Sequence, residues 1–250
     1  MPYGLYLSAD GAYAQSARVE TIANNLANVD TIGFKRELAT FQSRLAQSIA
    51  DGRQSAGSGS LDDIGGGVMV SGTQTDFSAG AMKRTSMPSD AAIDGDGFFL
   101  VQKDGENFLT RAGNFRVDPR GGLITQQGYA VLDDNLAPIR LNPAGGPIQI
   151  SPAGTVRQGF AAVNMAMVRP GSLGDLVKVG ENMFRPLADP QPIPAPQRRV
   201  MPGYLEQAAV QPVMEMTAMI EASRVLEANL NMMKAQDQML GNLIGRVLKA

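Results

Sequence analysis

The chain has 250 residues, of which 44% are hydrophobic, and a formal net charge of −2. It contains neither Cys nor His, which excludes disulfides, thiolate metal sites, Cys nucleophiles and the commonest general base. A net charge this close to zero gives no sign of a nucleic-acid partner or of an acidic membrane surface. Since no run of about 18 apolar residues occurs, no membrane-spanning helix is predicted.

The first predicted element is a helix from about Leu5 to Val29. Its apolar residues recur at an interval of seven positions, which is typical of the contact face of a coiled coil. This N-terminal seam consists of Leu5, Ala12, Val19 and Leu26, together with Ile22 and Val29.

Asparagines are unusually frequent near the end of this helix, at Asn24, Asn25 and Asn28. Asn competes for backbone hydrogen bonds and is therefore unfavourable inside a helix unless its amide has a partner. Two explanations remain open. The helix end frays into a turn at Asp30–Gly33, or the amides form hydrogen bonds across a helix–helix contact.

Residues 51–86 are predicted to form a flexible arm. The part from Asp51 to Gly67 is rich in Gly, Ser and Asp and cannot bury enough apolar surface to offset the entropy of ordering. The part from Val68 to Gly80 is polar, and we expect that it can become ordered against a neighbouring molecule.

From about Met87 to Arg199 the apolar residues recur with a period of two, which predicts β-strands separated by turns. The predicted strands are 98–102, 107–111, 115–118, 123–126, 129–132, 139–142, 148–151, 156–158 and 161–169. Asp104–Gly105 is the strongest hairpin signal among the turns. Six prolines from Pro186 to Pro202 predict an extended segment that leaves the β domain.

The last predicted element is a long helix from Pro212 to Ala250. Pro is tolerated in the first turn of a helix, where its missing N–H is harmless. At about 1.5 Å per residue the helix is roughly 55 Å long, so its apolar face needs a partner. This C-terminal seam consists of Met219, Leu226, Met233, Leu240 and Val247 at an interval of seven residues, flanked by Met216, Leu230 and Ile244. The alternative is a long core helix of a monomer.

The predicted fold class is α+β, with an all-β central domain inserted between N- and C-terminal helices that form coiled coils. The expected parts are an N-terminal helix and the residues after it (1–50), the flexible arm (51–86), the central β domain (87–199), and an extended return with the long helix (200–250).

No group of residues is assigned to catalysis, and neither a cofactor nor a metal is expected. Asp94–Gly97 resembles the start of a calcium loop, but an EF-hand needs Gly at its sixth position and Glu at its twelfth. Those positions hold Phe99 and Gly105, so a tight turn is predicted instead. Gly65–Gly67 lacks the Lys-Ser/Thr of a phosphate loop. An enzyme is therefore not expected.

Three blocks of sequence resemble the rod and hook axial proteins of the bacterial flagellum. Residues 22–35 (IANNLANVDTIGFK) resemble the N-terminal signature of that family. Residues 92–99 (AIDGDGFF), 110–115 (TRAGNF) and 128–132 (GYAVL) resemble its central β region. Residues 203–207 (GYLEQ), 212–216 (PVMEM) and 219–222 (MIEA) resemble its C-terminal signature.

The resemblance implies a flagellar basal-body rod protein, and within the family the length and the compact central domain look more like the proximal-rod F-type than the distal-rod G-type. It implies a structural subunit in the periplasmic drive shaft between motor and hook, exported through the flagellar type III apparatus without a cleaved signal peptide. The implied partners are copies of itself and other rod proteins, with neither nucleic acid nor membrane insertion. One departure is Gln211 before Pro212, where relatives usually have Asn. The alternative is a secreted or surface β-domain binding module that its helices dimerise.

The predicted assembly interface combines the two seams with the asparagines. It consists of Leu5, Ala12, Val19, Ile22, Asn24, Asn25, Leu26, Asn28, Val29, Met216, Met219, Leu226, Leu230, Met233, Leu240, Ile244 and Val247.

Overall fold

The computed structural model describes residues 3–45, 49, 51–52 and 65–247. Within them the chain forms two compact units. The helical unit comprises Met1–Ala27, Glu37–Asp76 and Gln211–Ala250, and the β unit comprises Asn28–Arg36 and Phe77–Val210. The central β-rich region between terminal helices confirms the predicted α+β class.

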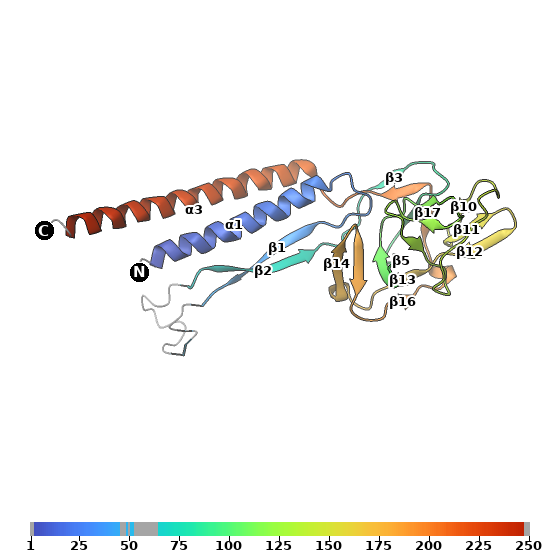
Figure 1. Ribbon diagram of the computed structural model, residues 1–250, viewed down its shortest axis with the longest axis horizontal. Helices are drawn as coiled ribbons and strands as arrows, with labels where there is room; N and C mark the ends of the chain where they lie inside the picture. Colours follow the sequence, from blue (N-terminus) through green and yellow to red (C-terminus); the bar gives the residue numbers. More distant parts are fainter. Residues whose placement is uncertain (1–2, 46–48, 50, 53–64, 248–250) are drawn as a thin grey trace. The chain divides into compact units, whose positions relative to one another are not determined.

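The helical unit contains two long helices, α1 (Tyr3–Ala27) and α3 (Pro212–Val247), among its described residues. They lie side by side in Figure 1, with both ends of the chain at the same end of the pair, so they run antiparallel. α3 begins at Pro212 as predicted. α1 ends before the predicted Val29, because the chain turns at Asn28, whose carbonyl accepts a hydrogen bond from the Thr31 N–H at 3.0 Å.

The helical unit also contains an antiparallel pair of strands, β1 (Glu37–Ser43) and β2 (Val68–Thr75). β1 is absent from the sequence predictions. β2 falls in the segment expected to become ordered against a neighbouring molecule, but it is ordered by β1 of its own chain, from Glu37↔Thr75 to Ser43↔Val68. Most of the predicted flexible segment between Asp51 and Gly67 lies outside the described residues.

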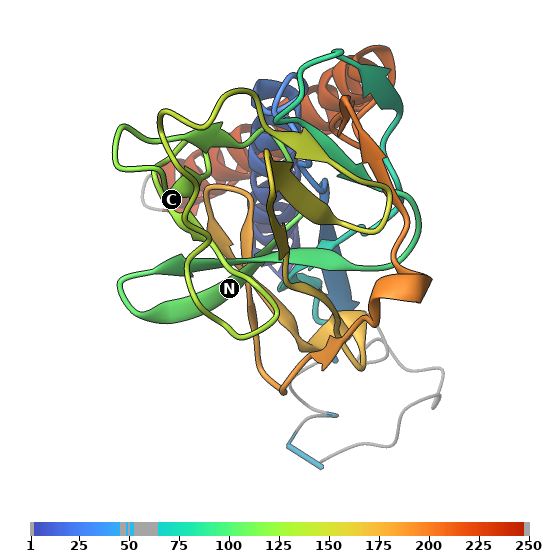
Figure 2. The ribbon, with the colours of Figure 1, turned by 90° about the vertical axis from the view of Figure 1, so that its right-hand side faces the viewer.

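The β unit is built around one antiparallel sheet with the strand order β14-β15-β6-β5-β9-β8-β7, in which β13 pairs with β5 and β16. In Figure 2 the strands of the β unit face the viewer. Its strands are β5 (Phe98–Lys103), β6 (Glu106–Thr110), β7 (Arg116–Val117), β8 (Leu123–Ile124), β9 (Ala130–Val131), β13 (Met167–Arg169), β14 (Leu176–Gly180), β15 (Met183–Pro186) and β16 (Gln191–Pro192).

Smaller sheets complete the β unit, with the orders β10-β11-β12, β17-β4 and β18-β3. Their strands are β3 (Met82–Arg84), β4 (Ala91–Ile93), β10 (Gln149–Ile150), β11 (Thr155–Gln158), β12 (Ala161–Asn164), β17 (Val200–Pro202) and β18 (Tyr204–Glu206). Short 3₁₀ helices lie at Leu173–Asp175 (η2) and Ala195–Gln197 (η3).

The core lies on both faces of β5. Phe99 and Val101 belong to one buried cluster, and Phe98 and Leu100 belong to another. Successive side chains of a strand point to opposite faces, so this sheet is buried on both sides. That is why β5 reads as a continuous apolar run in the sequence.

The β5–β6 hairpin confirms the Asp104–Gly105 turn. Both residues have positive φ, 52° and 85°, as a type I′ turn requires. Asp94–Gly97 forms the predicted turn before β5, and positive φ values of 105° at Gly95 and 155° at Gly97 explain its glycines.

Three sequence expectations in the β unit are wrong. Residues 161–169, predicted as one strand, form β12 and β13, which belong to different sheets. Residues 139–142, predicted as a strand, form only isolated bridges, such as Gly122↔Arg140. The proline-rich segment does not leave the β domain, because Ile193 and Val200 are buried in its core and β17 pairs with β4. Pro192 fits β16 because this strand pairs only with β13, and an edge strand has N–H positions that need no partner.

Candidate assembly interface

The face of α3 that packs on α1 alternates between two kinds of residue. The apolar kind, as the sequence predicts, is Met219, Leu226, Met233 and Leu240, and all four are half-buried. Between them lie Glu215, Ala222, Asn229 and Gln236, also buried or half-buried. The alternate spacing of three and four residues is the heptad spacing of helices that pack along their length.

Glycines of α1 make room for the amides of this face. A Cβ atom on Gly4 would lie 3.0 Å from Gln236 Nε2, and one on Gly11 would lie 3.1 Å from Asn229 Nδ2. Gly inside a helix costs about 1 kcal/mol relative to Ala, so close packing explains these residues better than propensity does. The matching interval of seven residues in Gly4/Gly11 and Asn229/Gln236 is a sequence signal that the periodicity of apolar residues missed.

Asn25 connects α1 to β1. Its Nδ2 donates to the Glu37 carbonyl at 2.8 Å, and its Oδ1 accepts from the Glu37 N–H at 2.9 Å. The side chain is 1% exposed. Neither explanation from the sequence is right for Asn25, because the helix end is ordered and the partner is a strand rather than a helix. Asn28 accepts from the Thr31 hydroxyl at 3.2 Å, and Asn24 is exposed.

The predicted interface residues lie in different environments. Residues that are covered within the helical unit are Leu5, Ala12, Val19, Ile22, Asn25, Leu26, Met219, Leu226, Met233 and Leu240. Exposed residues are Asn24, Met216, Leu230 and Ile244. Val29 packs against Phe34 in the β unit, where Asn28 also lies. The side chain of Val247 lies outside the described residues.

α3 keeps an apolar row exposed on each side of the face that α1 covers. One flank consists of Met216, Leu230 and Ile244, which are 45%, 43% and 59% exposed. The other consists of Val225, Met232 and Met239, which are 46%, 54% and 60% exposed. The first flank is interrupted by the exposed Ser223 and Asp237 at the intervening heptad positions. The second flank is apolar at three consecutive heptad positions, and an exposed apolar row of this kind indicates an interaction surface.

A buried group of charges holds the segment after α1 inside the β unit. Lys35 Nζ lies 2.5 Å from Glu206 Oε1, and both side chains are 1% exposed. The same Glu206 oxygen accepts from the Gly80 N–H at 3.0 Å, and Lys35 Nζ also donates to the Ser78 carbonyl at 2.8 Å. Arg111 Nη1 lies 3.5 Å from Glu206 Oε2. Burial lowers the pKa of Arg111, and the charges of Glu206 and Asp96 oppose that shift.

Gly33 and Phe34, which precede Lys35 in the sequence, are also held in place by contacts within the β unit. Gly33 donates its N–H to the Glu206 carbonyl at 2.8 Å. It has a φ of +68°, and a Cβ there would lie 2.6 Å from backbone atoms of Arg111 and Ala112. Phe34 is buried with Ala208 and Val210. The three sequence blocks that carry the family resemblance therefore meet around Lys35, Arg111 and Glu206, a cluster that sequence reasoning missed.

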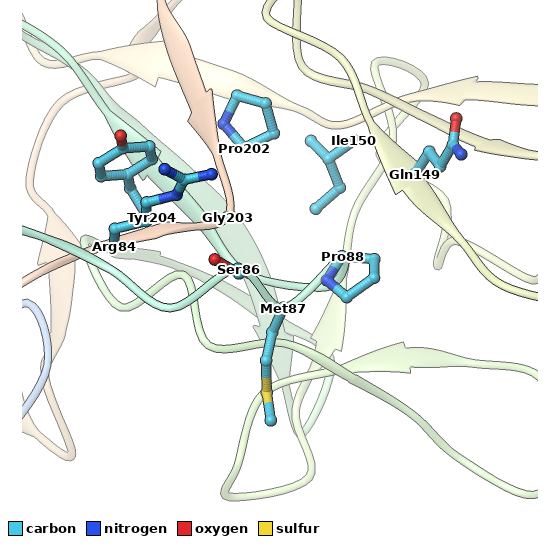
Figure 3. Close-up of a pocket in the computed structure, with 9 residues that line it drawn as sticks. All are labelled: Arg84, Ser86, Met87, Pro88, Gln149, Ile150, Pro202, Gly203 and Tyr204. Atoms are coloured by element: carbon cyan, nitrogen blue, oxygen red, sulfur yellow. The ribbon is translucent and has the colours of Figure 1, made fainter.

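The β unit also has a surface pocket of about 530 Å³. Figure 3 shows its lining, in which Met87, Pro88, Ile150 and Pro202 are the apolar members and Arg84 is the charged one. Among the described residues there is no group of three or more acidic side chains that could hold a metal ion. In the same part of the chain, no helix has a stretch apolar enough to cross a bilayer.

An antiparallel helix pair whose apolar flanks stay exposed among the described residues, in one chain with a β unit, is typical of a protein that packs against other molecules. Comparison with known proteins agrees. Residues 5–35 match the family model of the flagella basal body rod protein, residues 92–158 that of the flagellar hook protein FlgE/F/G D1 domain, and residues 201–246 that of the flagellar basal body rod FlgEFG protein C-terminal region.

Full-length relatives extend this match over the whole chain. A flagellar basal-body rod protein FlgF of Caulobacter vibrioides is 34% identical over 100% of this chain and 99% of its own length. A flagellar basal-body rod protein FlgG of Borreliella burgdorferi is 34% identical over 96% of this chain and 97% of its own length. A FlgG of Bacillus subtilis is 30% identical over 96% of this chain. The chain belongs to the flagellar basal-body rod protein family, and it is a structural protein rather than an enzyme.

The Lys35–Glu206 pair yields a stability prediction. Glu206→Gln removes the negative charge that lies beside the buried Lys35 ammonium, which costs about 3–5 kcal/mol. The matched control is Glu106→Gln, because Glu106 pairs with Arg185 at 3.3 Å on the surface, where the two side chains are 65% and 53% exposed. That exposed pair contributes about 0–1 kcal/mol. Urea unfolding of both variants checks the difference, and equal losses of stability would contradict the assignment.

The Asn25 contact yields a second prediction. Asn25→Ala removes the partner of both backbone groups of Glu37, at a cost of about 1–3 kcal/mol. Hydrogen exchange at the Glu37 amide should then become about 5- to 150-fold faster. Asn231→Ala, which changes an exposed amide of α3, should leave that rate unchanged. Unaltered protection of Glu37 in Asn25→Ala would show that the contact contributes nothing.

Proposed function

We propose that this protein is a structural subunit of the flagellar basal-body rod, and that it assembles with copies of itself and other rod proteins through α1 and α3. Membership of the family supports the rod role. The observation that carries the mode of assembly is the pair of apolar flanks on α3, since α1 covers only the row between them.

Covering the flanks contributes a favourable free energy to assembly. Full burial of one large apolar side chain contributes about 1.5–3 kcal/mol. The six flank residues are roughly half exposed, so covering them contributes on the order of 5–9 kcal/mol before entropic costs. A free subunit keeps this surface in water, whereas a subunit between two neighbours buries it.

The position of the flanks supports an open assembly. They lie on opposite sides of the row that α1 covers, so they face different neighbours. Contacts between unlike surfaces of identical subunits generate a helical filament when the rotation does not close. In this proposal Met216, Leu230 and Ile244 contact a neighbouring subunit directly, while residues such as Met219 and Leu226 hold α1 and α3 together within each subunit.

The finer parts of the proposal concern the place of the protein in the organelle. They are a position in the periplasmic drive shaft between motor and hook, passage through the flagellar type III export apparatus, and the proximal-rod F-type. What supports the F-type is the FlgF of Caulobacter vibrioides, which matches 100% of the chain, against 96% for the FlgG of Borreliella burgdorferi.

A second candidate function is a secreted or surface binding module that its helices dimerise. The observation in its favour is the pocket of about 530 Å³ in the β unit. The two functions differ in the mass of the purified protein at rising concentration. Closed dimers of constant mass favour the binding module, and open-ended or partner-dependent assembly favours the rod.

The substitution Leu230→Asp tests the rod proposal. Leu230 is 43% exposed, so a carboxylate there leaves the subunit folded but places an uncompensated charge in the contact with a neighbour. We expect circular dichroism like that of the unsubstituted chain, absence of the variant from isolated basal bodies, and loss of motility. The matched control is Asn231→Asp at the adjacent exposed position on another side of α3, which should incorporate normally. Normal incorporation of Leu230→Asp would contradict the proposal.

A further inference from the structure

α1 has a second regular row of residues, on the side facing away from α3. This outer row consists of Tyr6, Ala9, Tyr13, Ser16, Glu20 and Ala23, at alternate intervals of three and four residues. Tyr6 is 54% exposed and Tyr13 is 70% exposed. Large residues alternate with small ones at the start of the row, so each Tyr projects beyond its neighbours.

The flank of α3 that contains Met232 has the same construction. Its row consists of Val225, Ala228, Met232, Ala235, Met239 and Asn242, again at intervals of three and four residues. Val225, Met232 and Met239 are about half exposed, and the alanines between them are exposed. None of these six residues is charged. The alanines leave hollows between larger side chains, and Met packs favourably against aromatic rings.

These two rows cannot meet within one subunit. On a helix with 3.6 residues per turn, the outer row of α1 lies about opposite the side where Gly4 and Gly11 contact α3. A row of tyrosine knobs and a row of alanine hollows with the same spacing are nevertheless complementary, as in the packing of helices along a shared heptad.

We propose that the outer row of α1 packs into the Val225–Asn242 row of α3 in a second copy of this chain. This inference rests on the proposed rod function and specifies the surfaces that meet. The contact joins unlike surfaces, so each copy offers one row to one neighbour and the other row to the next, and the assembly stays open.

The area of the contact is small, so we expect the contact to be weak between two free subunits and strong only in an array. The large side chains of the two rows are Tyr6, Tyr13, Val225, Met232 and Met239, and their exposed fractions are 46–70%. If each side chain has a surface of about 250 Å², which is an upper value, the contact can bury less than about 900 Å² of it. Stable pairs of proteins bury roughly 1,200 Å² or more. Two free subunits are therefore held weakly, and the contact becomes strong only where several act together in an array.

Cysteine cross-linking in basal bodies tests this contact, because the chain contains no Cys. Tyr13→Cys is combined in the same chain with Val225→Cys, Met232→Cys or Met239→Cys, which gives three double variants. Oxidation should give a ladder of covalent dimers, trimers and longer products from at least one double variant. Which double variant reacts depends on the register of α1 in one copy against α3 in the next. The matched control combines Tyr13→Cys with Asn231→Cys, which lies beside the row but outside it, and should give no ladder. The purified double variants should form no disulfide within a single chain.

The outcomes separate this inference from the proposed function. If the unsubstituted chain is missing from basal bodies, the rod function fails. If the double variants are present in basal bodies and none gives a ladder, or Asn231→Cys gives one equally, only this contact fails. A cross-link to a different component would overturn the assignment to a second copy. If Tyr13→Cys folds but is excluded, while Tyr13→Phe is incorporated, the loss of the knob itself supports the contact.

Discussion

The buried ion pair between Lys35 and Glu206 is the constraint on which the β unit depends. It joins residues that are 171 positions apart, and removal of either partner leaves a charge in an environment with almost no water. Phe34, Ala208 and Val210 pack together next to it in the sequence. The segment that follows α1 and the segment that precedes α3 are therefore held beside one another in the β unit. When a β region is inserted between two terminal helices, a contact of this kind holds together the two chain segments that enter and leave the β region.

The helix pair combines specificity with a capacity for further contacts. Asn229 and Gln236 lie opposite Gly4 and Gly11, and polar residues at such positions fix the register of paired helices at some cost in stability. The apolar rows on both sides of this face remain exposed. One helix thus has a central row that α1 covers and two flanks that stay exposed, which the proposed assembly assigns to neighbouring subunits. The Met residues on the flanks are adaptable in packing, which suits contacts with subunits that are similar but not identical.

Local signals predicted the elements whose structure is decided locally. Pro212 marks the start of α3, the interval of seven residues identifies its covered face, and Asp104–Gly105 gives the β5–β6 hairpin. Contacts between residues far apart in the sequence were not predictable from local patterns. β17 pairs with β4 across more than 100 residues, and the partner of Asn25 is the backbone of Glu37 rather than another side chain. The ion pair of Lys35 was equally inaccessible, because isolated charged residues usually lie on the surface.

The central claim is that both flanks of α3 are covered by neighbouring subunits in the rod. The most direct measurement is maleimide labelling of Leu230→Cys and Met232→Cys, one on each flank, in the free chain and in isolated basal bodies. The account expects rapid labelling of both cysteines in the free chain and strong protection of both in the basal body. Equal labelling in the two states would contradict it.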